Sequence, residues 1–311
     1  MNAYLKLIRW PNLLIMAVAM FLVRYYLVRG PLLLVGTDLA STLVDFVLLV
    51  VAMLFISAAG YVINDVFDMD IDSLNKQEKQ IVGRLIPVQT AKRLYWLLSA
   101  AGMLIMVYLG YRLNSWQLTL IVLMLTGLLW FYSERYKRQI LVGNLVVAFI
   151  ASAGITVVWL FEFFSLVRES DGFIVASAAM PLMSGLVFAY ALFAFLSTLT
   201  REMVKDIEDM SGDARFGCRT FPVVYGQITA RNLSAATLII LIIMIGFWQY
   251  ILYFREMTQA MMVLFLALGI GIFALIRLAL ANKPEHYGFV SSLLKLLMLA
   301  GLLSVVFLKS M

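Results

Sequence analysis

The sequence predicts an all-α membrane protein in which nine transmembrane helices form one bundle. Of its 311 residues, 63% are hydrophobic and only 14% are charged, and the mean hydropathy is +0.96. These values lie far outside the composition of soluble domains. Apolar runs of about 20 residues, the length of helix that crosses the hydrocarbon core of a bilayer, recur along the chain. No low-complexity linker separates the runs, so residues 1–311 are expected to form a single integral-membrane domain.

Nine of these runs have the length and hydropathy expected of a transmembrane helix. They cover roughly residues 12–29, 40–63, 94–112, 116–133, 141–163, 177–200, 231–253, 257–280 and 287–308.

The charges between the runs predict the orientation of the bundle, because lysine and arginine concentrate on the cytoplasmic side of membrane proteins. The N-terminus and the connections after the second, fourth, sixth and eighth runs hold most of them. The other connections and the C-terminus hold only Arg29, Arg112, Arg168, Arg255 and Lys309. We therefore expect a multi-pass protein of the cell (inner or plasma) membrane with its N-terminus in the cytoplasm.

Two of the cytoplasmic connections, residues 65–93 and 201–230, are long enough for a short helix that caps the bundle. Each also holds a cluster of carboxylates. An aspartate at the bilayer centre costs roughly 2.5–3.5 kcal/mol, so these side chains must face water, a cation or protein.

The two acidic clusters have the same spacing, with carboxylates at i, i+3 and i+7 on one face of a helix. The second follows the first at a constant offset of 141 residues (206 − 65, 209 − 68 and 213 − 72). An even number of runs separates them, so both lie on the cytoplasmic side. The pattern indicates one site built twice and a weak two-half repeat; the alternative is that the charges only solvate the loops. The members are Asp65, Asp68, Asp72, Asp206, Asp209 and Asp213.

Carboxylate oxygens are hard ligands that suit Mg²⁺ or Ca²⁺. Because Mg²⁺ is usually completed by substrate phosphates, two facing clusters predict a site for two or three Mg²⁺ ions and a diphosphate. Basic residues that bind phosphate oxygens lie beside both clusters. They are Lys76, Lys79, Arg84, Arg201, Lys205, Arg215 and Arg219.

A diphosphate whose hydrocarbon tail dissolves among membrane lipids is a polyprenyl diphosphate. Departure of its metal-held diphosphate leaves an allylic cation, which aromatic faces stabilise in a dry pocket. The site therefore favours prenyl transfer to a lipophilic acceptor. The formal net charge of +6 does not indicate a nucleic-acid partner, because the cations lie between apolar runs. No feature requires an obligate protein partner, and the single Cys218 and single His286 argue against disulfide and zinc sites.

The stretches Asn64-Asp65-x-x-Asp68-x-x-x-Asp72 and Asp206-x-x-Asp209-x-x-x-Asp213 resemble the two signatures of the UbiA-type intramembrane prenyltransferases. The resemblance covers essentially the whole chain, and it implies a nine-helix bundle with a central cavity, cytoplasmic caps, a lateral opening to lipid and Mg²⁺-dependent prenyl transfer. Shorter matches follow in order at Arg9-Trp10-Pro11-Asn12, Tyr132-Ser133, Lys137-Arg138, Gly143-Asn144 and Gly217-Cys218-Arg219-Thr220.

By this resemblance the metal ligands are Asn64, Asp68, Asp72, Asp206, Asp209 and Asp213. Asp65 joins these carboxylates in the expected catalytic group, and Asp65 or Asp206 is the candidate base. The register of the second group has competitors, because Glu202 and Glu208 offer other helical pairings. The residues expected to bind substrates are Asn12, Arg24, Asn64, Lys79, Arg84, Tyr132, Lys137, Arg201 and Lys205. Lys79-Gln80 departs from the Arg-Pro of many members but keeps the charge.

The acceptor is predicted from residues 201–213, which resemble the branch that transfers geranylgeranyl to geranylgeranylglyceryl phosphate. That acceptor is anionic, and Arg24, inside the first run, is a candidate partner for it; the alternative is packing or snorkelling. Lys295, inside the last run, has either a substrate role or a helix–helix contact. Aromatic acceptors of quinone biosynthesis, of the menaquinone or ubiquinone type, are the alternative, and the haem and chlorophyll branches also remain.

Two other function classes compete with the enzyme. A cation-coupled transporter would use the acidic clusters as ion sites, and a lipid-binding scaffold would not need them. Transporters place ionisable groups near the membrane midplane. The clusters here lie at the membrane edge beside basic residues, which favours the enzyme.

Overall fold

The structure is a computed structural model that describes residues 2–69, 80–168 and 170–308. Within these ranges the chain is almost entirely helical and has no strand. Nine helical segments of the described chain are long and apolar enough to cross a membrane, as the sequence predicts. They are Trp10–Leu34 (α2, η1 and α3), Leu43–Phe67 (α4), Val88–Arg112 (α6), Trp116–Glu134 (α7), Val142–Arg168 (α8), Met180–Arg215 (α10), Gln227–Phe254 (α12), Thr258–Ala279 (α13) and Pro284–Phe307 (α14 and η3).

Two of the spans contain a change of helix type. In the first, α2 (Trp10–Leu22) and α3 (Arg29–Leu34) flank a π-helical segment, η1 (Val23–Val28). The last span consists of α14 (Pro284–Ser304) and the 3₁₀ turn η3 (Val305–Phe307). The remaining short elements are α1 (Ala3–Leu7), η2 (Tyr136–Arg138), α9 (Ser170–Ser177) and α11 (Phe221–Tyr225).

Helix α4 is the central helix of the bundle. Thr42 caps its start by accepting a hydrogen bond from the backbone N–H of Asp45 at 3.1 Å. Apolar residues then follow on all sides, the pattern of a helix surrounded by protein. In its apolar window 61% of the residues are buried, against 22–44% in the other eight spans. The helix ends at Phe67, so Asn64 and Asp65 occupy its last turn and Asp68 is its C-cap.

Helix α10 is longer than the apolar run at residues 177–200. It continues to Arg215, so residues 201–215, expected in a loop, are helical and carry the second acidic cluster. Hydropathy marks where an apolar run ends and not where a helix ends. This segment is rich in Glu, Lys, Arg and Met, and it contains no proline, so nothing in it stops the helix.

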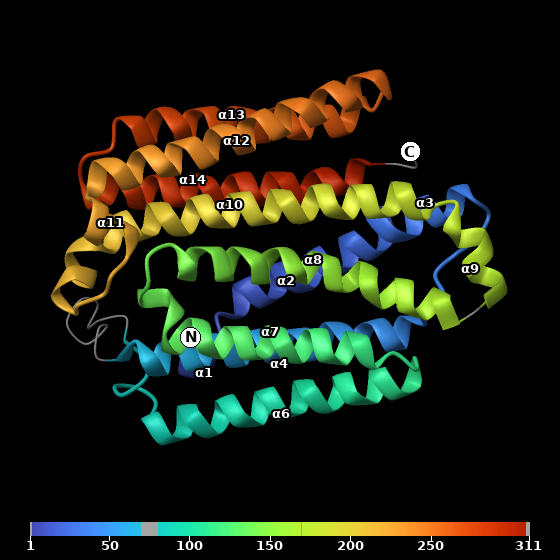
Figure 1. The fold of residues 1–311 in the computed structure, drawn as a ribbon, viewed down its shortest axis with the longest axis horizontal. Coiled ribbons are helices and arrows are strands. Elements are labelled where there is room, and N and C mark those ends of the chain that lie inside the picture. Colours follow the sequence, from blue (N-terminus) through green and yellow to red (C-terminus); the bar gives the residue numbers. More distant parts are fainter. Residues whose placement is uncertain (1, 70–79, 169, 309–311) are drawn as a thin grey trace.

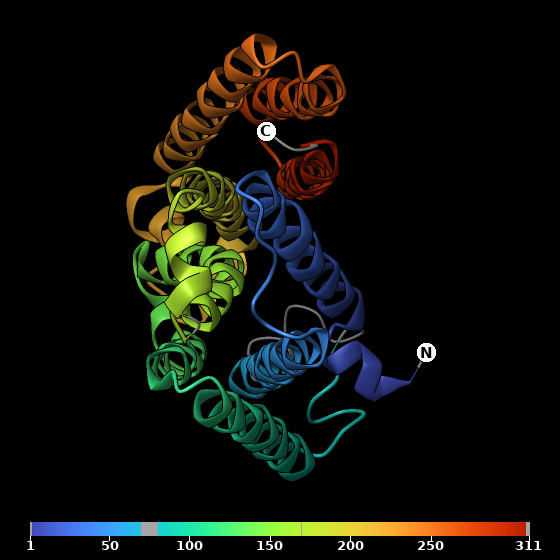
Figure 2. The same cartoon turned by 90° about the vertical axis from the view of Figure 1, so that its right-hand side faces the viewer.

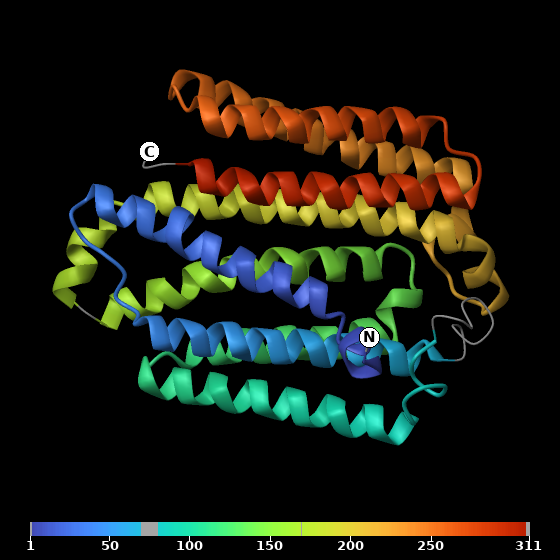
Figure 3. The same cartoon turned by 180° about the vertical axis from the view of Figure 1, so that it is seen from behind.

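The long helices run roughly parallel to the long axis of the molecule and are arranged around it (Figure 1). Figure 2, viewed along that axis, shows α12 and α13 at one edge, α6 at the other, and α2, α4, α7, α8, α10 and α14 between them. Helix α2 runs obliquely across one face, as Figure 3 shows. It begins near α4 and, through η1 and α3, reaches α10 at the other end. The chain termini lie at opposite ends of the bundle (Figure 1).

Both α4 and α10 finish at the end of the bundle that carries α11 (Figure 1). We call it the acidic end, defined by residues 64–68 and 201–215. Helix α11, five residues long, is a short helix in the connection between α10 and α12. Residues 70–79 of the first connection lie outside the described chain, so the pair of cytoplasmic caps stays a prediction.

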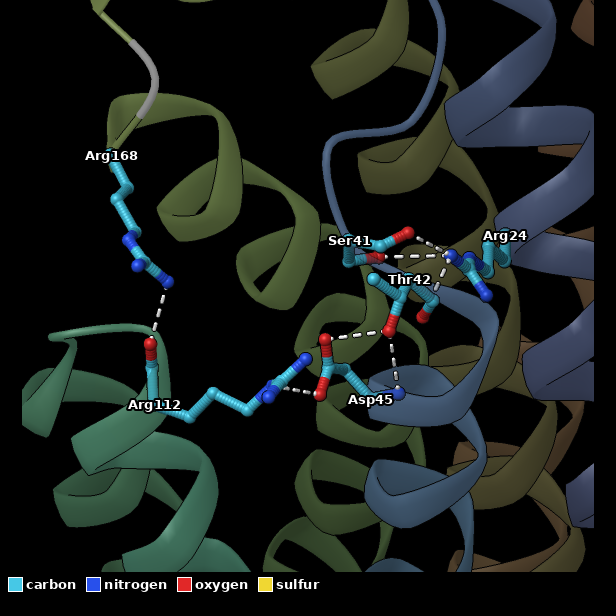
Figure 4. Close-up of polar contacts among 6 residues, drawn as sticks. All are labelled: Arg24, Ser41, Thr42, Asp45, Arg112 and Arg168. Atoms are coloured by element: carbon cyan, nitrogen blue, oxygen red, sulfur yellow. Dashed lines mark hydrogen bonds and ion pairs between the residues drawn. The ribbon is translucent and has the colours of Figure 1, made fainter.

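A buried polar network holds the opposite end together. The Arg24 guanidinium, 2% exposed, donates to the Ser41 carbonyl at 2.7 Å and to Ser41 Oγ at 2.9 Å, and it stacks on the ring of Phe46 (Figure 4). Glu162 of α8 accepts hydrogen bonds from the N–H groups of Ala40 and Ser41 and from Ser41 Oγ. The network therefore ties η1 and α8 to the loop before α4.

A second pair of contacts lies beside it. Arg112, at the end of α6, forms an ion pair with Asp45 at 2.5 Å, and its carbonyl accepts a hydrogen bond from Arg168 at 2.6 Å (Figure 4). These contacts join the ends of α6 and α8 to the start of α4.

Candidate active site

A cavity of about 770 Å³ opens among α2, α4, α7, α8, α10 and α14. Towards the acidic end its walls are polar and charged. Deeper in the bundle they become apolar, with a lining that includes Met20, Met53, Val122, Ile155, Phe193 and Leu302.

The structure brings most of the predicted site residues to this cavity, although they come from four membrane-spanning helices and two connections. Eleven of them line its wall: Asn12, Asn64, Asp65, Asp68, Tyr132, Lys137, Arg201, Lys205, Asp206, Asp209 and Asp213.

The first acidic cluster forms where α4 ends. Asp68 Oδ2 accepts a hydrogen bond from Asn64 Nδ2 at 2.8 Å, one helical turn earlier, and it forms an ion pair with the Lys137 ammonium. Asp65 accepts a hydrogen bond from Arg9 Nη2 at 3.0 Å. The Asp68 carboxylate therefore lies at the cavity wall, where it pairs with one cation, the Lys137 ammonium.

The second acidic cluster lies on the cavity face of α10, where Asp206, Asp209 and Asp213 follow one another at helical spacing. Asn144 Nδ2 donates a hydrogen bond to Asp206 Oδ2 at 2.8 Å. Thr220 Oγ1 donates to Asp213 Oδ2 at 3.3 Å. Each of these partners comes from a segment outside α10, so tertiary contacts orient the two carboxylates.

The turn between α7 and α8 links the two clusters. It carries Lys137, and its Arg138 donates to the Phe67 carbonyl at the end of α4, at 3.1 Å. The Arg138 carbonyl in turn accepts from the backbone N–H of Arg219, beyond α10, at 2.9 Å. A Cβ atom at residue 143 would lie 2.8 Å from Lys137 Cα, so only Gly143 lets the start of α8 pack against this turn.

Tyr132 lies between the clusters, because the charges of both Asp68 and Asp206 act on its hydroxyl. Arg201 forms an ion pair with Glu202, the neighbouring cavity residue. The mouth of the cavity therefore alternates acidic groups with basic and hydroxyl groups, as a site for metal-bound phosphates requires.

Among the described residues, two predicted site residues, Arg24 and Arg84, do not line the cavity. Asp72 and Lys79 lie outside the described residues. Arg84 is exposed on the connection before α6. Arg24 lies in the polar network at the opposite end, where its hydrogen bonds go to Ser41.

Asn144 and Arg9 are not among the predicted site residues, although both lie in matched motifs. Their partners, Asp206 and Asp65, are 62 and 56 residues away in the chain, so only the fold pairs them. A polar residue directly after Gly143, at the start of an apolar run, is the signal that could have indicated Asn144.

Cys218 also lines the cavity but is not suited to act as a nucleophile. Burial of the thiol, with the nearby Asp213 carboxylate, raises the pKa of Cys218. Since the thiolate is the nucleophilic form, the group stays protonated at neutral pH.

The donor set fits Mg²⁺ that is shared with a phosphate-bearing ligand. Among the described residues no three Asp, Glu, His or Cys side chains come close enough to hold a metal ion by themselves. Mg²⁺ does not require such a cage, because it commonly takes one or two carboxylates and completes its shell with water and substrate phosphates. Asn64 and Asp68 on one wall, and the three α10 aspartates on the other, supply hard oxygen donors of this kind.

A multi-pass membrane bundle whose cavity has an acidic mouth and an apolar interior fits the class of membrane enzymes that act on amphiphilic phosphates. Residues 26–299 match the UbiA prenyltransferase family, and the chain belongs to that family. It is an integral membrane prenyltransferase.

Relatives and solved structures agree with this assignment. The chain is 33% identical to the digeranylgeranylglyceryl phosphate synthase of Sulfolobus acidocaldarius over 226 residues, 73% of this chain and 70% of that protein. A solved structure of a digeranylgeranylglyceryl phosphate synthase in membranes matches 99% of this chain and 98% of its own, with a TM-score of 0.65 and 23% identity. A UbiA homologue from Archaeoglobus fulgidus, solved with DMAPP and Mg²⁺, matches 98% of this chain and 99% of its own, with a TM-score of 0.57 and 17% identity.

Proposed function

We propose that this enzyme transfers a geranylgeranyl group from its diphosphate to geranylgeranylglyceryl phosphate, in a Mg²⁺-dependent reaction of ether-lipid synthesis. The observation that carries the proposal is the union of both acidic clusters at the mouth of one cavity whose deeper wall is apolar. A prenyl diphosphate has the same division, with its charges at one end and a hydrocarbon chain at the other.

The acceptor is proposed from similarity. The relative from Sulfolobus acidocaldarius is a digeranylgeranylglyceryl phosphate synthase, as is one of the matching solved structures. Residues 201–213 carry the same resemblance, and six of them line the cavity: Arg201, Glu202, Lys205, Asp206, Asp209 and Asp213.

The reaction conserves its atoms as a substitution at C1 of the prenyl chain. The bond from C1 to the diphosphate oxygen breaks, and its electron pair leaves with the diphosphate. The acceptor hydroxyl oxygen forms a new bond to C1, and the hydroxyl proton passes to a base. We assign the base to Asp65 or Asp206, the candidates at the two walls of the cavity mouth.

The residues divide the work of binding and orientation. Asn64, Asp68, Asp206, Asp209 and Asp213, together with Asp72, would hold Mg²⁺, which neutralises the leaving diphosphate and acts as a Lewis acid. Basic side chains bind phosphate oxygens directly, as charge-assisted hydrogen bonds. They are assigned to Lys79, Arg84, Lys137, Arg201 and Lys205. Asn12 and Tyr132 line the cavity and are assigned to positioning the substrates, while the apolar lining would exclude water from the allylic cation.

The activity test uses purified protein, Mg²⁺ and labelled geranylgeranyl diphosphate. Geranylgeranylglyceryl phosphate and 1,4-dihydroxy-2-naphthoate are offered in parallel, because an aromatic acceptor of quinone biosynthesis is the alternative. We expect a labelled diether phosphate and diphosphate release that stop when EDTA is added. Prenylation of the naphthoate alone would contradict the proposed acceptor.

We also propose that the acidic end faces the cytoplasm of the cell membrane, since the basic connections gather there. A reporter enzyme that is active only outside the cytoplasm should be active when fused to the C-terminus. Activity only in an N-terminal fusion would contradict this orientation.

A further inference from the structure

Lys295 is a charged residue inside a membrane-spanning helix that the reaction described above does not use. It lies on α14, its side chain is exposed, and among the described residues no carboxylate forms an ion pair with it. A lysine that faces hydrocarbon at this depth is costly, so such residues commonly face a water-filled cavity and mark a substrate path.

The helix geometry turns Lys295 towards the cavity. Three residues of α14 line the cavity: Met298, Leu299 and Leu302. They follow Lys295 at i+3, i+4 and i+7, which is the same face of the helix. Lys295 is not itself among the lining residues, but it lies on the same face of α14, one helical turn closer to the acidic end.

The packing of α14 on α10 sets what lies opposite Lys295. Two close approaches fix the antiparallel register: Gly301 packs on the ring of Phe193, and Gly288 packs on the carboxylate of Glu208. Lys295 lies midway between the two glycines. Arg201 lies midway between their partners, so the register brings Lys295 and Arg201 to the same level.

The electrostatic environment agrees with this register, because the charges of Arg201, Lys205, Glu202 and Glu208 all act on Lys295. The two carboxylates are engaged elsewhere: Glu202 forms an ion pair with Arg201, and Glu208 packs against α14 one helical turn past its start. Lys295 thus adds a third positive charge to Arg201 and Lys205 on one side of the cavity mouth.

Arg201 has donors left over for a ligand. Its Nη1 binds Glu202, while its Nε is buried and has no hydrogen-bond partner within the described chain. A buried donor without a partner is costly, so a bound acceptor group stabilises it. The planar guanidinium and the flexible ammonium together suit an anion with several oxygens.

We infer that Lys295 and Arg201 bind the phosphate of the acceptor lipid. The inference rests on the proposed function, because only a glyceryl phosphate acceptor brings a phosphomonoester to this wall. That group carries about two negative charges and three acceptor oxygens. The alternative cation for this role, Arg24, does not line the cavity, and its Nη2 donates to Ser41 in the polar network at the opposite end.

The position also suits the reaction. Arg201 and Asp206 are five residues apart on α10 (206 − 201), a rise of about 7.5 Å along the helix. The free hydroxyl of the acceptor belongs to the same glycerol unit as its phosphate. A phosphate held by Lys295 and Arg201 therefore places the hydroxyl next to the site assigned to the metal-bound diphosphate.

The test compares Lys295→Met, which keeps the length of the side chain and removes its charge, with Lys295→Arg and with the control Lys283→Met. Lys283 is the N-cap of the same helix, twelve residues before Lys295 (295 − 283) and therefore far from the level of Arg201. We expect Lys295→Met to raise the KM for geranylgeranylglyceryl phosphate about tenfold or more, as for one lost charge-assisted hydrogen bond. The KM for geranylgeranyl diphosphate and the rate with dephosphorylated geranylgeranylglycerol should not change. Lys295→Arg and Lys283→Met should resemble the wild type.

Binding of geranylgeranylglyceryl phosphate is measured separately, by the shift in Tm of the purified protein. If the wild type binds this lipid but does not prenylate it, and Lys295→Met loses the binding, the proposed function fails while the phosphate site stands. If the wild type prenylates the lipid and Lys295→Met keeps the same KM and Tm shift, the phosphate site fails while the function stands. No binding by the wild type overturns both.

Discussion

Asn144 donates a hydrogen bond to Asp206 at 2.8 Å, and this contact joins the start of α8 to the second acidic cluster on α10. The amide holds one carboxylate oxygen and leaves the other free for a ligand. The orientation of Asp206 at the cavity mouth thus depends on the packing of α8 against α10. Residues of this kind are the clearest targets for tests of the site.

Substitution of Asn144 tests whether that orientation matters. We expect Asn144→Ala to lower kcat/KM by about tenfold to a hundredfold, since a hydrogen bond to a charged group contributes about 1.5–3 kcal/mol. Steady-state kinetics with purified protein measure the effect. Asn232→Ala, on the exposed side of α12, is the matched control and should keep wild-type activity. An unchanged rate in Asn144→Ala would mean that Asp206 needs no such support.

The acidic clusters can be tested one at a time. Asp68→Ala and Asp209→Ala are each expected to abolish turnover while the protein elutes and unfolds like the wild type. They belong to opposite walls of the cavity mouth, so a shared metal–diphosphate site needs both. The measurement is labelled product per enzyme across a Mg²⁺ titration. Full activity in either variant contradicts the shared site.

The polar network at the opposite end predicts a stability effect without a substrate effect. We expect Arg24→Met to lower the free energy of unfolding by on the order of 2 kcal/mol, because it removes the Arg24 donor from the Ser41 carbonyl and the positive charge that acts on Glu162. Thermal unfolding in detergent measures this loss. The KM for both substrates should stay within about twofold of the wild type. A selective rise in the acceptor KM would instead assign Arg24 to the acceptor.

Gly301 predicts a steric effect that a second change should relieve. A Cβ atom at this position would collide with the ring of Phe193, which also lines the cavity. We expect Gly301→Ala to destabilise the protein by about 1–3 kcal/mol, the usual cost of overpacking. The double variant with Phe193→Leu should recover most of the lost Tm, and an additive loss would show that the two residues do not meet.

Cys218, the one cysteine of the chain, offers a direct report of cavity occupancy. Because burial raises the pKa of this thiol, alkylation should be slow at pH 7 and should speed up with rising pH beyond the range of an ordinary thiol. Mass spectrometry after N-ethylmaleimide treatment measures the rate. Mg²⁺ with geranylgeranyl diphosphate should slow the labelling several-fold. If Mg²⁺ and geranylgeranyl diphosphate leave the labelling rate unchanged, the diphosphate does not bind next to Cys218.

The fold followed from hydropathy because a bilayer imposes a simple rule. Each apolar run must form a helix long enough to satisfy its own backbone inside the membrane. The nine predicted spans therefore match nine observed ones in the described chain. The predicted sixth run ends at residue 200, whereas α10 continues to Arg215. Hydropathy missed this extension because the rule does not determine where a helix continues beyond the membrane.

Sequence spacing alone predicted two acidic triplets, 141 residues apart, on one side of a membrane bundle, and five of the six carboxylates line one cavity in the described chain. It did so because helical periodicity and the alternation of spans are local properties of the chain. Tertiary structure alone decided which groups meet these carboxylates. Asn144 on Asp206, Lys137 on Asp68, and Lys295 level with Arg201 all depend on how separate helices pack. Arg24 also depends on tertiary structure. The sequence suggested a substrate ligand, whereas in the folded chain its guanidinium donates hydrogen bonds to Ser41.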